Sequence, residues 1–222
     1  MKLTIVAATG GIGRLLLAQA LADGHEVTAV ARRPEAVQPP PGRVVAADLA
    51  IATADDLVPA VAGADAVLSG LGGHSRHDTD VATHGTEAII GAMRATGVSR
   101  VVVVSAAPIG TVASPARPNP PRHDPGEGPL MRHVLSPAIK AVLRGHYADL
   151  ARMEDALRAS GLDWTIVRPP KLTNGRLTGA YRTAYGHNLR GGTAVSRRNV
   201  ADYMLRAVTD PASVRETVGI AG

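Results

Sequence analysis

Cysteine and phenylalanine are absent from this 222-residue chain, and aromatic residues make up only 2% of it. Without cysteine, a disulfide scaffold, a cysteine nucleophile and a zinc–thiolate site are excluded. With one tryptophan and four tyrosines, the core must be aliphatic, and aromatic platforms for stacking nucleic-acid bases are missing. We therefore expect no nucleic-acid partner. The formal charge of +5 fits an arginine-rich surface or an anionic small ligand equally well.

Long apolar runs are also missing. The longest uncharged run, residues 101–116, is interrupted by prolines and a glycine and is shorter than the ~18 apolar residues that cross a membrane. The apolar start of the chain ends in glycines rather than in the small-residue cleavage site of a signal peptide. These features, with the lack of cysteine, favour a cytoplasmic protein without a membrane partner.

Apolar runs of strand length alternate with helical patterns along most of the chain. The predicted strands are 2–8, 27–31, 43–47, 66–69, 100–105, 164–168 and 217–220, and the predicted helices are 12–23, 55–61, 80–96, 137–160 (with Ser136 as its cap) and 199–209. Such alternation indicates parallel strands with helices on both faces. We predict an α/β fold, a single domain over residues 1–222 built on one doubly wound parallel sheet of six or seven strands.

Two stretches interrupt the alternation. Residues 107–136 carry seven prolines, and residues 171–195 are rich in glycine and arginine with a short strand-like piece at 180–184. Both follow the carboxyl end of a strand, the edge at which doubly wound sheets bind ligands. Both are therefore candidates for the substrate site. Because prolines remove backbone donors, we expect residues 107–136 to be a mobile cover rather than part of the core.

The sharpest local motif is Ala7-Ala8-Thr9-Gly10-Gly11-Ile12-Gly13, between the first strand and the first helix. A tight turn needs glycine, and the helix amino terminus offers free N–H groups and a positive dipole end to a pyrophosphate. Gly13 also lets the helix pack closely on the strand. Glycines end strands without any function as well, but this position favours a dinucleotide site.

Arg32 and Arg33 follow the second predicted strand, nineteen and twenty residues after Gly13. A guanidinium fits a ribose 2′-phosphate, whereas the carboxylate typical of NAD sites would repel it. The alternative is two solvated arginines. Asp48, just after the third strand, is placed to accept from an adenine amino group, or it belongs to a turn or helix cap. These residues predict NADPH as the cofactor.

These motifs resemble the atypical branch of the short-chain dehydrogenase/reductase superfamily, the NmrA-like NAD(P)H-binding proteins with a Rossmann fold. The closest resemblance is to the biliverdin-IXβ reductase/NADPH-flavin reductase group. The segments that carry it are Ala8-Thr9-Gly10-Gly11-Ile12-Gly13, Asp65-Ala66-Val67, Gly97-Val98-Ser99-Arg100-Val101-Val102, Leu157-Arg158-Ala159-Ser160-Gly161-Leu162 and, most distinctively, Pro169-Pro170-Lys171 followed by Leu177-Thr178-Gly179-Ala180-Tyr181.

The resemblance implies a cofactor site built from several turns. It assigns the pyrophosphate to Thr9, Gly10, Gly11, Ile12 and Gly13, the 2′-phosphate to Arg32 and Arg33, the adenine to Asp48 and Leu49, the nearby ribose to Leu71, Gly72 and Gly73, and the nicotinamide to Ser105, Pro169, Pro170 and Lys171. The chain departs from the group at four of its positions. Ala7 replaces a glycine, Ile12 a hydroxyl residue, Ala106 a second serine and Lys171 a histidine.

The superfamily's usual proton relay, a tyrosine with a lysine four residues later, is missing. Tyr147 is followed at that offset by Ala151, so alcohol–ketone chemistry through such a relay is not expected. Hydride transfer to a flat acceptor depends mainly on positioning. We expect Ser105 and Lys171 to be the catalytic residues, Lys171 through its charge, unless it is simply an exposed loop lysine. Glu154 either faces this site or is an exposed partner of Arg158.

We therefore predict an NADPH-dependent oxidoreductase that acts on a small aromatic acceptor such as a flavin, quinone or tetrapyrrole. Two alternatives remain: an NADP(H)-binding redox sensor without turnover, and a sugar epimerase or dehydratase, which the missing relay disfavours. Two histidines and two aspartates lie within residues 74–80, but Arg76 among them repels a cation, and no metal site is predicted. We expect a monomer or a small homo-oligomer.

Overall fold

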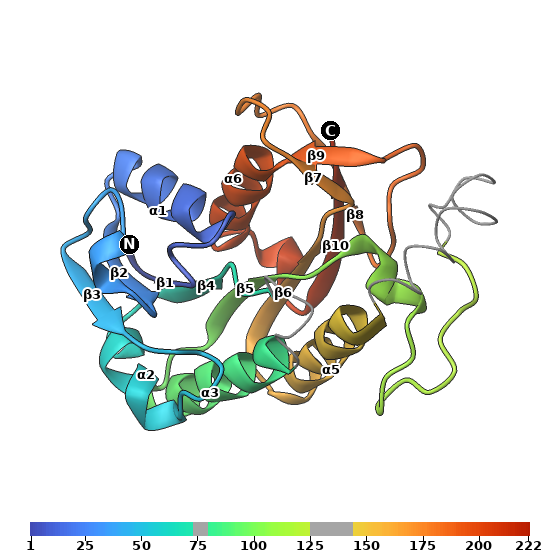
Figure 1. Ribbon diagram of the computed structural model, residues 1–222. Helices are drawn as coiled ribbons and strands as arrows, with labels where there is room; N and C mark the ends of the chain where they lie inside the picture. The colour runs from blue at the N-terminus through green and yellow to red at the C-terminus, as the bar shows by residue number, and fades with distance from the viewer. Residues whose placement is uncertain (73–79, 125–143) are drawn as a thin grey trace.

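A mostly parallel sheet runs through the centre of the computed structural model, which describes residues 1–72, 80–124 and 144–222 (Figure 1). Its strand order is β3-β2-β1-β4-β5-β6-β10-β8. The bounds are β1 Lys2–Val6, β2 Glu26–Ala31, β3 Arg43–Ala46, β4 Ala66–Ser69, β5 Arg100–Val104, β6 Asp163–Arg168, β8 Arg182–Tyr185 and β10 Glu216–Ala221. The predicted doubly wound α/β fold is confirmed. Among the strands described, β8 alone is antiparallel; it pairs with β10 at the edge and falls where a short strand-like piece was expected at 180–184.

Helices cover both faces of the sheet (Figure 1). α1 (Gly13–Ala22) and α6 (Arg197–Ala207) lie on one face, and α2 (Ala54–Val61), α3 (Val81–Thr96) and α5 (Arg144–Ala159) lie on the other. Because side chains alternate along a strand, each inner strand contributes to the core on both faces of the sheet. In β5, Val101 and Val103 join one core cluster, and Val102 and Val104 join the other. The core is aliphatic, as predicted. In the described part of the chain, no helix combines the length and apolarity of a membrane span.

The helix that carries one wall of the later site, α5, is tied to α3 by a buried aspartate. Asp149 on α5 accepts hydrogen bonds from the backbone N–H groups of Ala82 (2.9 Å) and Thr83 (3.0 Å), the first turn of α3. These donors would otherwise lack partners at a helix start. The helix predicted over 137–160 is confirmed from Arg144 to Ala159; its expected start and the Ser136 cap lie outside the described residues.

The described parts of the two interruptions contain short elements of regular structure. In the 171–195 stretch, β7 (Lys171–Thr173) pairs in parallel with β9 (Ala194–Ser196) as a second small sheet. Short 3-10 helices span Pro34–Ala36, Ala107–Thr111 and Pro211–Ser213.

The expectation that residues 107–136 lie apart from the core is wrong at the 107 end of the segment. Ile109 is fully buried in the main core cluster. The 107 end is also anchored, because the Ala107 N–H donates to the Pro169 carbonyl at 2.9 Å. The prolines forbid a strand or long helix here but not burial of an apolar side chain in a short 3-10 turn.

Candidate functional site

The glycine-rich turn after β1 is closed by direct backbone contacts. The Gly10 N–H donates to the Ala7 carbonyl at 2.8 Å. A Cβ on Gly13 would lie 2.0 Å from that carbonyl oxygen, and one on Gly70 would lie 2.8 Å from the Gly13 nitrogen. Ala7 has φ +58°, the left-handed conformation that favours glycine. The turn therefore keeps its shape with alanine at this position, while Gly13 and Gly70 admit no side chain.

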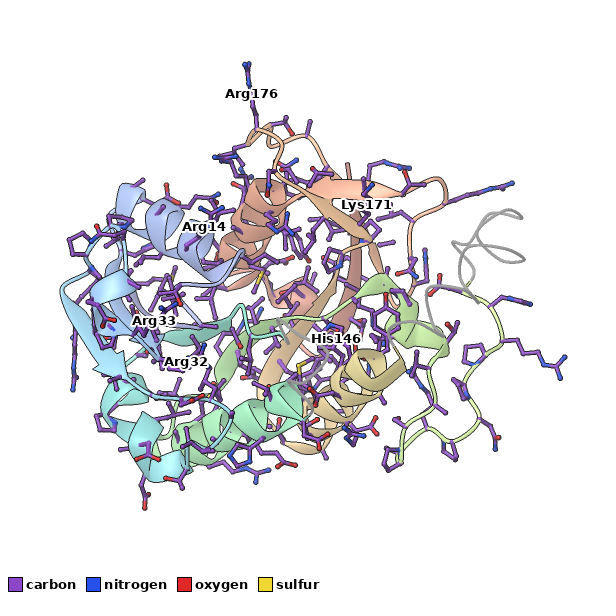
Figure 2. All side chains as sticks on the ribbon, viewed as in Figure 1. Arg14, Arg32, Arg33, His146, Lys171 and Arg176 are labelled. Carbon is purple, nitrogen blue, oxygen red and sulfur yellow. The ribbon has the colours of Figure 1, made fainter. Side chains whose placement is uncertain are left out.

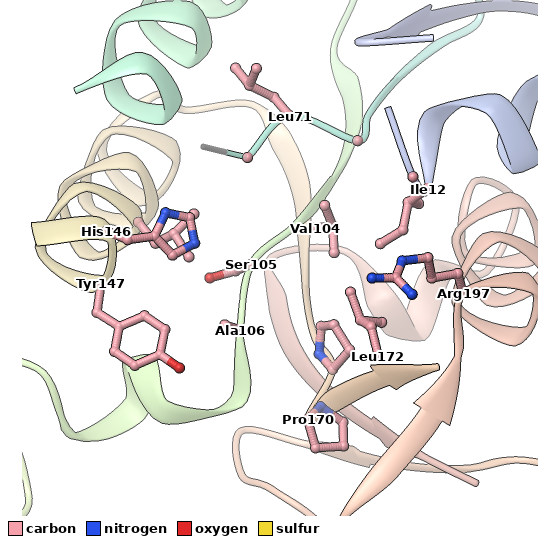
Figure 3. Close-up of a pocket in the computed structure, with 15 residues that line it drawn as sticks. Ile12, Leu71, Val104, Ser105, Ala106, His146, Tyr147, Pro170, Leu172 and Arg197 are labelled. Carbon is pink, nitrogen blue, oxygen red and sulfur yellow. The ribbon is translucent and has the colours of Figure 1, made fainter. Parts of the chain in front are cut away.

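A cavity of about 380 Å³ opens beside this turn (Figure 3). It lies at the carboxyl ends of β1, β4, β5 and β6, next to the point between β1 and β4 where the strand order reverses. Doubly wound sheets bind ligands at this crevice. The lining residues are Gly11, Ile12, Gly70, Leu71, Gly72, Val104, Ser105, Ala106, His146, Tyr147, Leu150, Pro169, Pro170, Leu172 and Arg197.

The structure brings seven of the predicted site residues together around this cavity. They are Gly11, Ile12, Leu71, Gly72, Ser105, Pro169 and Pro170. Thr9, Gly10 and Gly13 belong to the same turn without lining the cavity. Arg32 and Arg33 are exposed after β2, at a distance from His146 and Lys171 in Figure 2. Gly73 lies outside the described residues, as do the histidines of residues 74–79.

Asp48 and Leu49 stand after β3, away from the cavity. The Asp48 carboxylate accepts from the Ala50 N–H at 3.2 Å and its carbonyl accepts from Ala52 at 2.8 Å. This is the turn that was the alternative reading of Asp48. Its side chain is half-buried and keeps a second carboxylate oxygen for a ligand. Leu49 is buried beneath it in the core.

Lys171, which was predicted as a catalytic residue, does not line the cavity either. It is exposed on β7, while Pro169, Pro170 and Leu172 line the cavity. Successive side chains of a strand point to opposite sides, so Leu172 takes the inward position and Lys171 points outward. The alternative of an exposed lysine describes it correctly.

A buried polar network lies directly behind Ser105. The Ser105 hydroxyl donates to Oε1 of Glu154 at 2.7 Å, and Arg168 at the end of β6 donates to both carboxylate oxygens of Glu154, through Nε at 2.9 Å. Arg158 adds a second ion pair to Glu154, at 2.7 Å. Glu154 is fully buried, so the exposed-helix alternative is wrong, although the pairing with Arg158 is correct. Its contact with the site runs through Ser105.

Glu154 is ionised despite its burial. Burial by itself would raise its pKa, but the hydrogen bonds and charges of Arg168 and Arg158, together with Ser105, outweigh burial and hold the pKa below its usual value. A carboxylate accepts and cannot donate. The Ser105 proton is therefore committed to Glu154, and the oxygen lone pairs of Ser105 remain available to accept a hydrogen bond from the cavity.

The first turns of α5 form the opposite wall, with His146 and Tyr147 beside Leu150 (Figure 3). Burial lowers the pKa of His146, with Asp149 opposing the shift. Burial raises the pKa of the Tyr147 phenol. Four residues after Tyr147, Ala151 is buried in the core. The arrangement expected of a tyrosine–lysine relay is thus absent from α5.

Arg197, the first residue of α6, is the main site residue that the sequence did not identify. Its guanidinium points into the cavity near Ile12 and Leu172 (Figure 3), and its Nε would lie 3.2 Å from a Cβ on Gly11. Nη1 donates to Oδ1 of Asn174 at 2.9 Å. In the sequence Arg197 and Arg198 form only a basic pair, and nothing local indicates that Arg197 lies against a turn at the other end of the chain.

The geometry fits a dinucleotide. A half-buried guanidinium lies against a glycine turn in which side chains would not fit, and helix α1 begins at this turn, where the positive end of its dipole favours a phosphate. No group of three histidine, cysteine, aspartate or glutamate residues in the described ranges could hold a metal ion.

Comparisons with known proteins agree with this geometry. The NAD(P)H-binding family model matches residues 7–211. An uncharacterized protein of Mycobacterium tuberculosis is 35% identical over 105 residues, which cover 47% of this chain and 12% of that protein. The chain thus spans a small part of the length of the curated relatives it matches.

Three solved structures share the fold over the whole chain. A short-chain dehydrogenase/reductase from Veillonella parvula in complex with NADP has a TM-score of 0.76 at 20% identity, covering 100% of this chain and 94% of its own. An anaerobillin reductase from Escherichia coli O157:H7 scores 0.74 at 22% identity, covering 100% and 97%. A putative NADH-flavin reductase from Streptococcus pneumoniae scores 0.73 at 23% identity, covering 100% and 99%.

The predicted fold and the resemblance to NAD(P)H-binding proteins are therefore confirmed. Since the family model spans nearly the whole chain, from the glycine-rich turn to the end of α6, this protein belongs to the NAD(P)H-binding family.

Proposed function

We propose that this protein is an NADPH-dependent oxidoreductase that reduces a flat, conjugated small molecule such as a flavin, a quinone or a tetrapyrrole. The observation that carries the proposal is the cavity itself. It adjoins the glycine-rich turn, carries Ser105 on its floor, and has a tyrosine wall without a lysine partner. A bound reduced nicotinamide would supply the hydride.

The cofactor preference rests on the end of β2. Arg32 and Arg33 are exposed there, and neither takes part in an ion pair among the residues that the structure describes. A 2′-phosphate would give these guanidinium groups an anionic partner. Gly11 and Ile12 would lie against the pyrophosphate, and Leu71 and Gly72 would lie beside the ribose that carries the nicotinamide.

Ser105 would orient the nicotinamide. Because its proton is held by Glu154 at 2.7 Å, its oxygen would accept a hydrogen bond from the carboxamide N–H of the cofactor. Pro169 and Pro170 would pack on the ring from the end of β6. Positioning of this kind can supply several kcal/mol of a barrier without any covalent step.

The acceptor would stack in the remaining apolar part of the cavity, between Leu172 and the Tyr147 wall. Burial raises the pKa of the Tyr147 phenol above its ordinary value of 10.0, which makes it a poor acid near neutral pH. An acceptor that can take its proton from solvent suits this site better than a ketone. The missing relay thus argues for a conjugated acceptor and against a sugar epimerase or dehydratase.

The test is NADPH oxidation by the purified protein against a panel of FMN, a soluble quinone and biliverdin, with an aliphatic ketone as the negative substrate. We expect saturable turnover with at least one conjugated acceptor and none with the ketone. Tight NADPH binding without turnover on any acceptor would instead support a redox sensor. Turnover of the ketone that is lost in Tyr147→Phe would restore the tyrosine acid and refute the proposal.

A further inference from the structure

Arg197 occupies an unusual place for a surface cation. It is half-buried and lines the main cavity as well as a second, smaller one of about 190 Å³ that also contacts Arg14 and Arg198. Its Nε lies within 3.2 Å of the space that a side chain at Gly11 would fill. The guanidinium therefore packs against the glycine-rich turn at the edge of the cavity.

The side chain is held in this place by the 171–195 stretch. Nη1 of Arg197 donates to Oδ1 of Asn174 at 2.9 Å, and the neighbouring Arg198 donates to the Asn174 and Gly175 carbonyls at 3.3 and 3.0 Å. Ser196 caps α6 by accepting from the Asn199 N–H at 3.0 Å, which fixes the helix start that carries Arg197. The guanidinium is thus preorganised by neutral partners that leave its charge uncompensated.

The stretch that leads up to Arg197 contains no acidic residue, and Asp202 farther along α6 pairs with Arg206. Residues 164–201 contain seven lysines and arginines and no aspartate or glutamate. Of these seven, only Arg168 forms an ion pair among the residues described, with Glu154. A half-buried guanidinium without an anion is costly, so this arrangement is better explained by an anion that arrives with a ligand than by stability of the fold.

We propose that Arg197, at the start of α6, is a further cofactor-binding residue, whose guanidinium binds the pyrophosphate together with the glycine-rich turn. The inference rests on the proposed NADPH site and adds a residue to it. Helix α1 would meet one face of the pyrophosphate with N–H groups, and α6 would meet the other with a charged side chain. Asn174 is the positioning residue that acts through Arg197, so cofactor binding is coupled to the β7–β9 stretch that borders the acceptor cavity.

Two ligands distinguish a specific contact between Arg197 and the pyrophosphate from a general attraction of anions to positive charge. The 2′-phospho form of ADP-ribose contains the pyrophosphate, whereas adenosine 2′,5′-bisphosphate lacks it, and both carry the 2′-phosphate. Binding is measured calorimetrically for wild type, Arg197→Gln, Asn174→Ala and the control Arg176→Gln, which removes the same charge from an exposed side chain that points away from the rest of the molecule (Figure 2). We expect Arg197→Gln to weaken 2′-phospho-ADP-ribose about tenfold or more and adenosine 2′,5′-bisphosphate less than threefold.

The controls distinguish the possible failures. Arg176→Gln should change both affinities by less than about threefold, and Asn174→Ala should fall between wild type and Arg197→Gln for the pyrophosphate ligand only. Equal weakening of both ligands, or equal effects of Arg197→Gln and Arg176→Gln, would overturn the proposed contact with the pyrophosphate and leave a diffuse electrostatic effect. If wild type binds neither ligand, the NADPH site itself fails; if it binds both and Arg197→Gln matches wild type, only the role of Arg197 fails.

Discussion

Neutralising Glu154 should reveal how strongly the site depends on its buried network. In Glu154→Gln the carboxylate charge disappears, but Arg168 stays buried with 5% of its side chain exposed and loses its anionic partner. Breaking a buried ion pair in this way costs about 3–5 kcal/mol. Arg158 is 33% exposed, so solvent screens its share and it adds little.

For a chain of this length, each kcal/mol shifts the melting temperature by about 2–4 °C. Thermal unfolding of Glu154→Gln, followed by circular dichroism at neutral pH, should therefore show a midpoint lower by about 6–20 °C. The matched control is Glu87→Gln on α3, which removes the same charge from an exposed side chain and should change stability by less than about 0.5 kcal/mol.

The pH dependence of the stability provides a second, independent test. The pKa of Glu154 in the folded protein lies below its ordinary value of 4.5. Its stabilising effect is therefore complete above that ordinary value and is lost as the pH falls through the lower, folded-state pKa. The difference between wild type and Glu154→Gln should shrink in this acidic window. A melting midpoint within about 2 °C of wild type at neutral pH, or a difference that stays constant on acidification, would refute the reasoning.

Three further predictions concern the site. Arg32→Ala should lose a charge-assisted contact worth about 1.5–3 kcal/mol, so that calorimetry shows NADPH binding weakened roughly ten- to a hundredfold and NADH binding nearly unchanged; equal wild-type affinities for the two would contradict it. Gly13→Ala places a methyl group 2.0 Å from the Ala7 carbonyl and should abolish detectable NADPH binding in the same assay, a result that wild-type affinity would rule out. Tyr147→Phe should keep kcat for FMN within a few-fold of wild type, because burial has already made the phenol a weaker acid; a thousandfold loss at unchanged cofactor affinity would restore the tyrosine relay.

Local sequence patterns predicted the sheet because each strand and helix has a recognisable pattern of its own. The four valines after Arg100 form a strand buried on both faces, which β-branched residues favour, and Gly97 ends α3 at φ +74° as a helix-terminal glycine does. The glycine-rich turn was equally visible, since its spacing between a strand and a helix has few other uses.

The site walls were harder to predict because they depend on contacts between distant segments. Glu154 and Arg158 have the spacing of an exposed helical ion pair, and only the packing of α5 against β6 brings Arg168 to the same carboxylate. Lys171 was expected at the nicotinamide because residues 171–173 were expected to belong to a loop. They form strand β7, in which side chains alternate between the two sides. Arg197 reaches Gly11 through the packing of α6 beside α1, which no local pattern records.

The most direct test of the central claim is an anaerobic single-turnover experiment. Protein loaded with NADPH is mixed with FMN, and the near-ultraviolet absorbance of the reduced nicotinamide is followed together with flavin bleaching. If the cavity holds both rings in contact, the two signals should decay together, at a rate that saturates with FMN and far exceeds that of free NADPH. Decay at the rate of free NADPH, for FMN and for every other conjugated acceptor, would contradict the account.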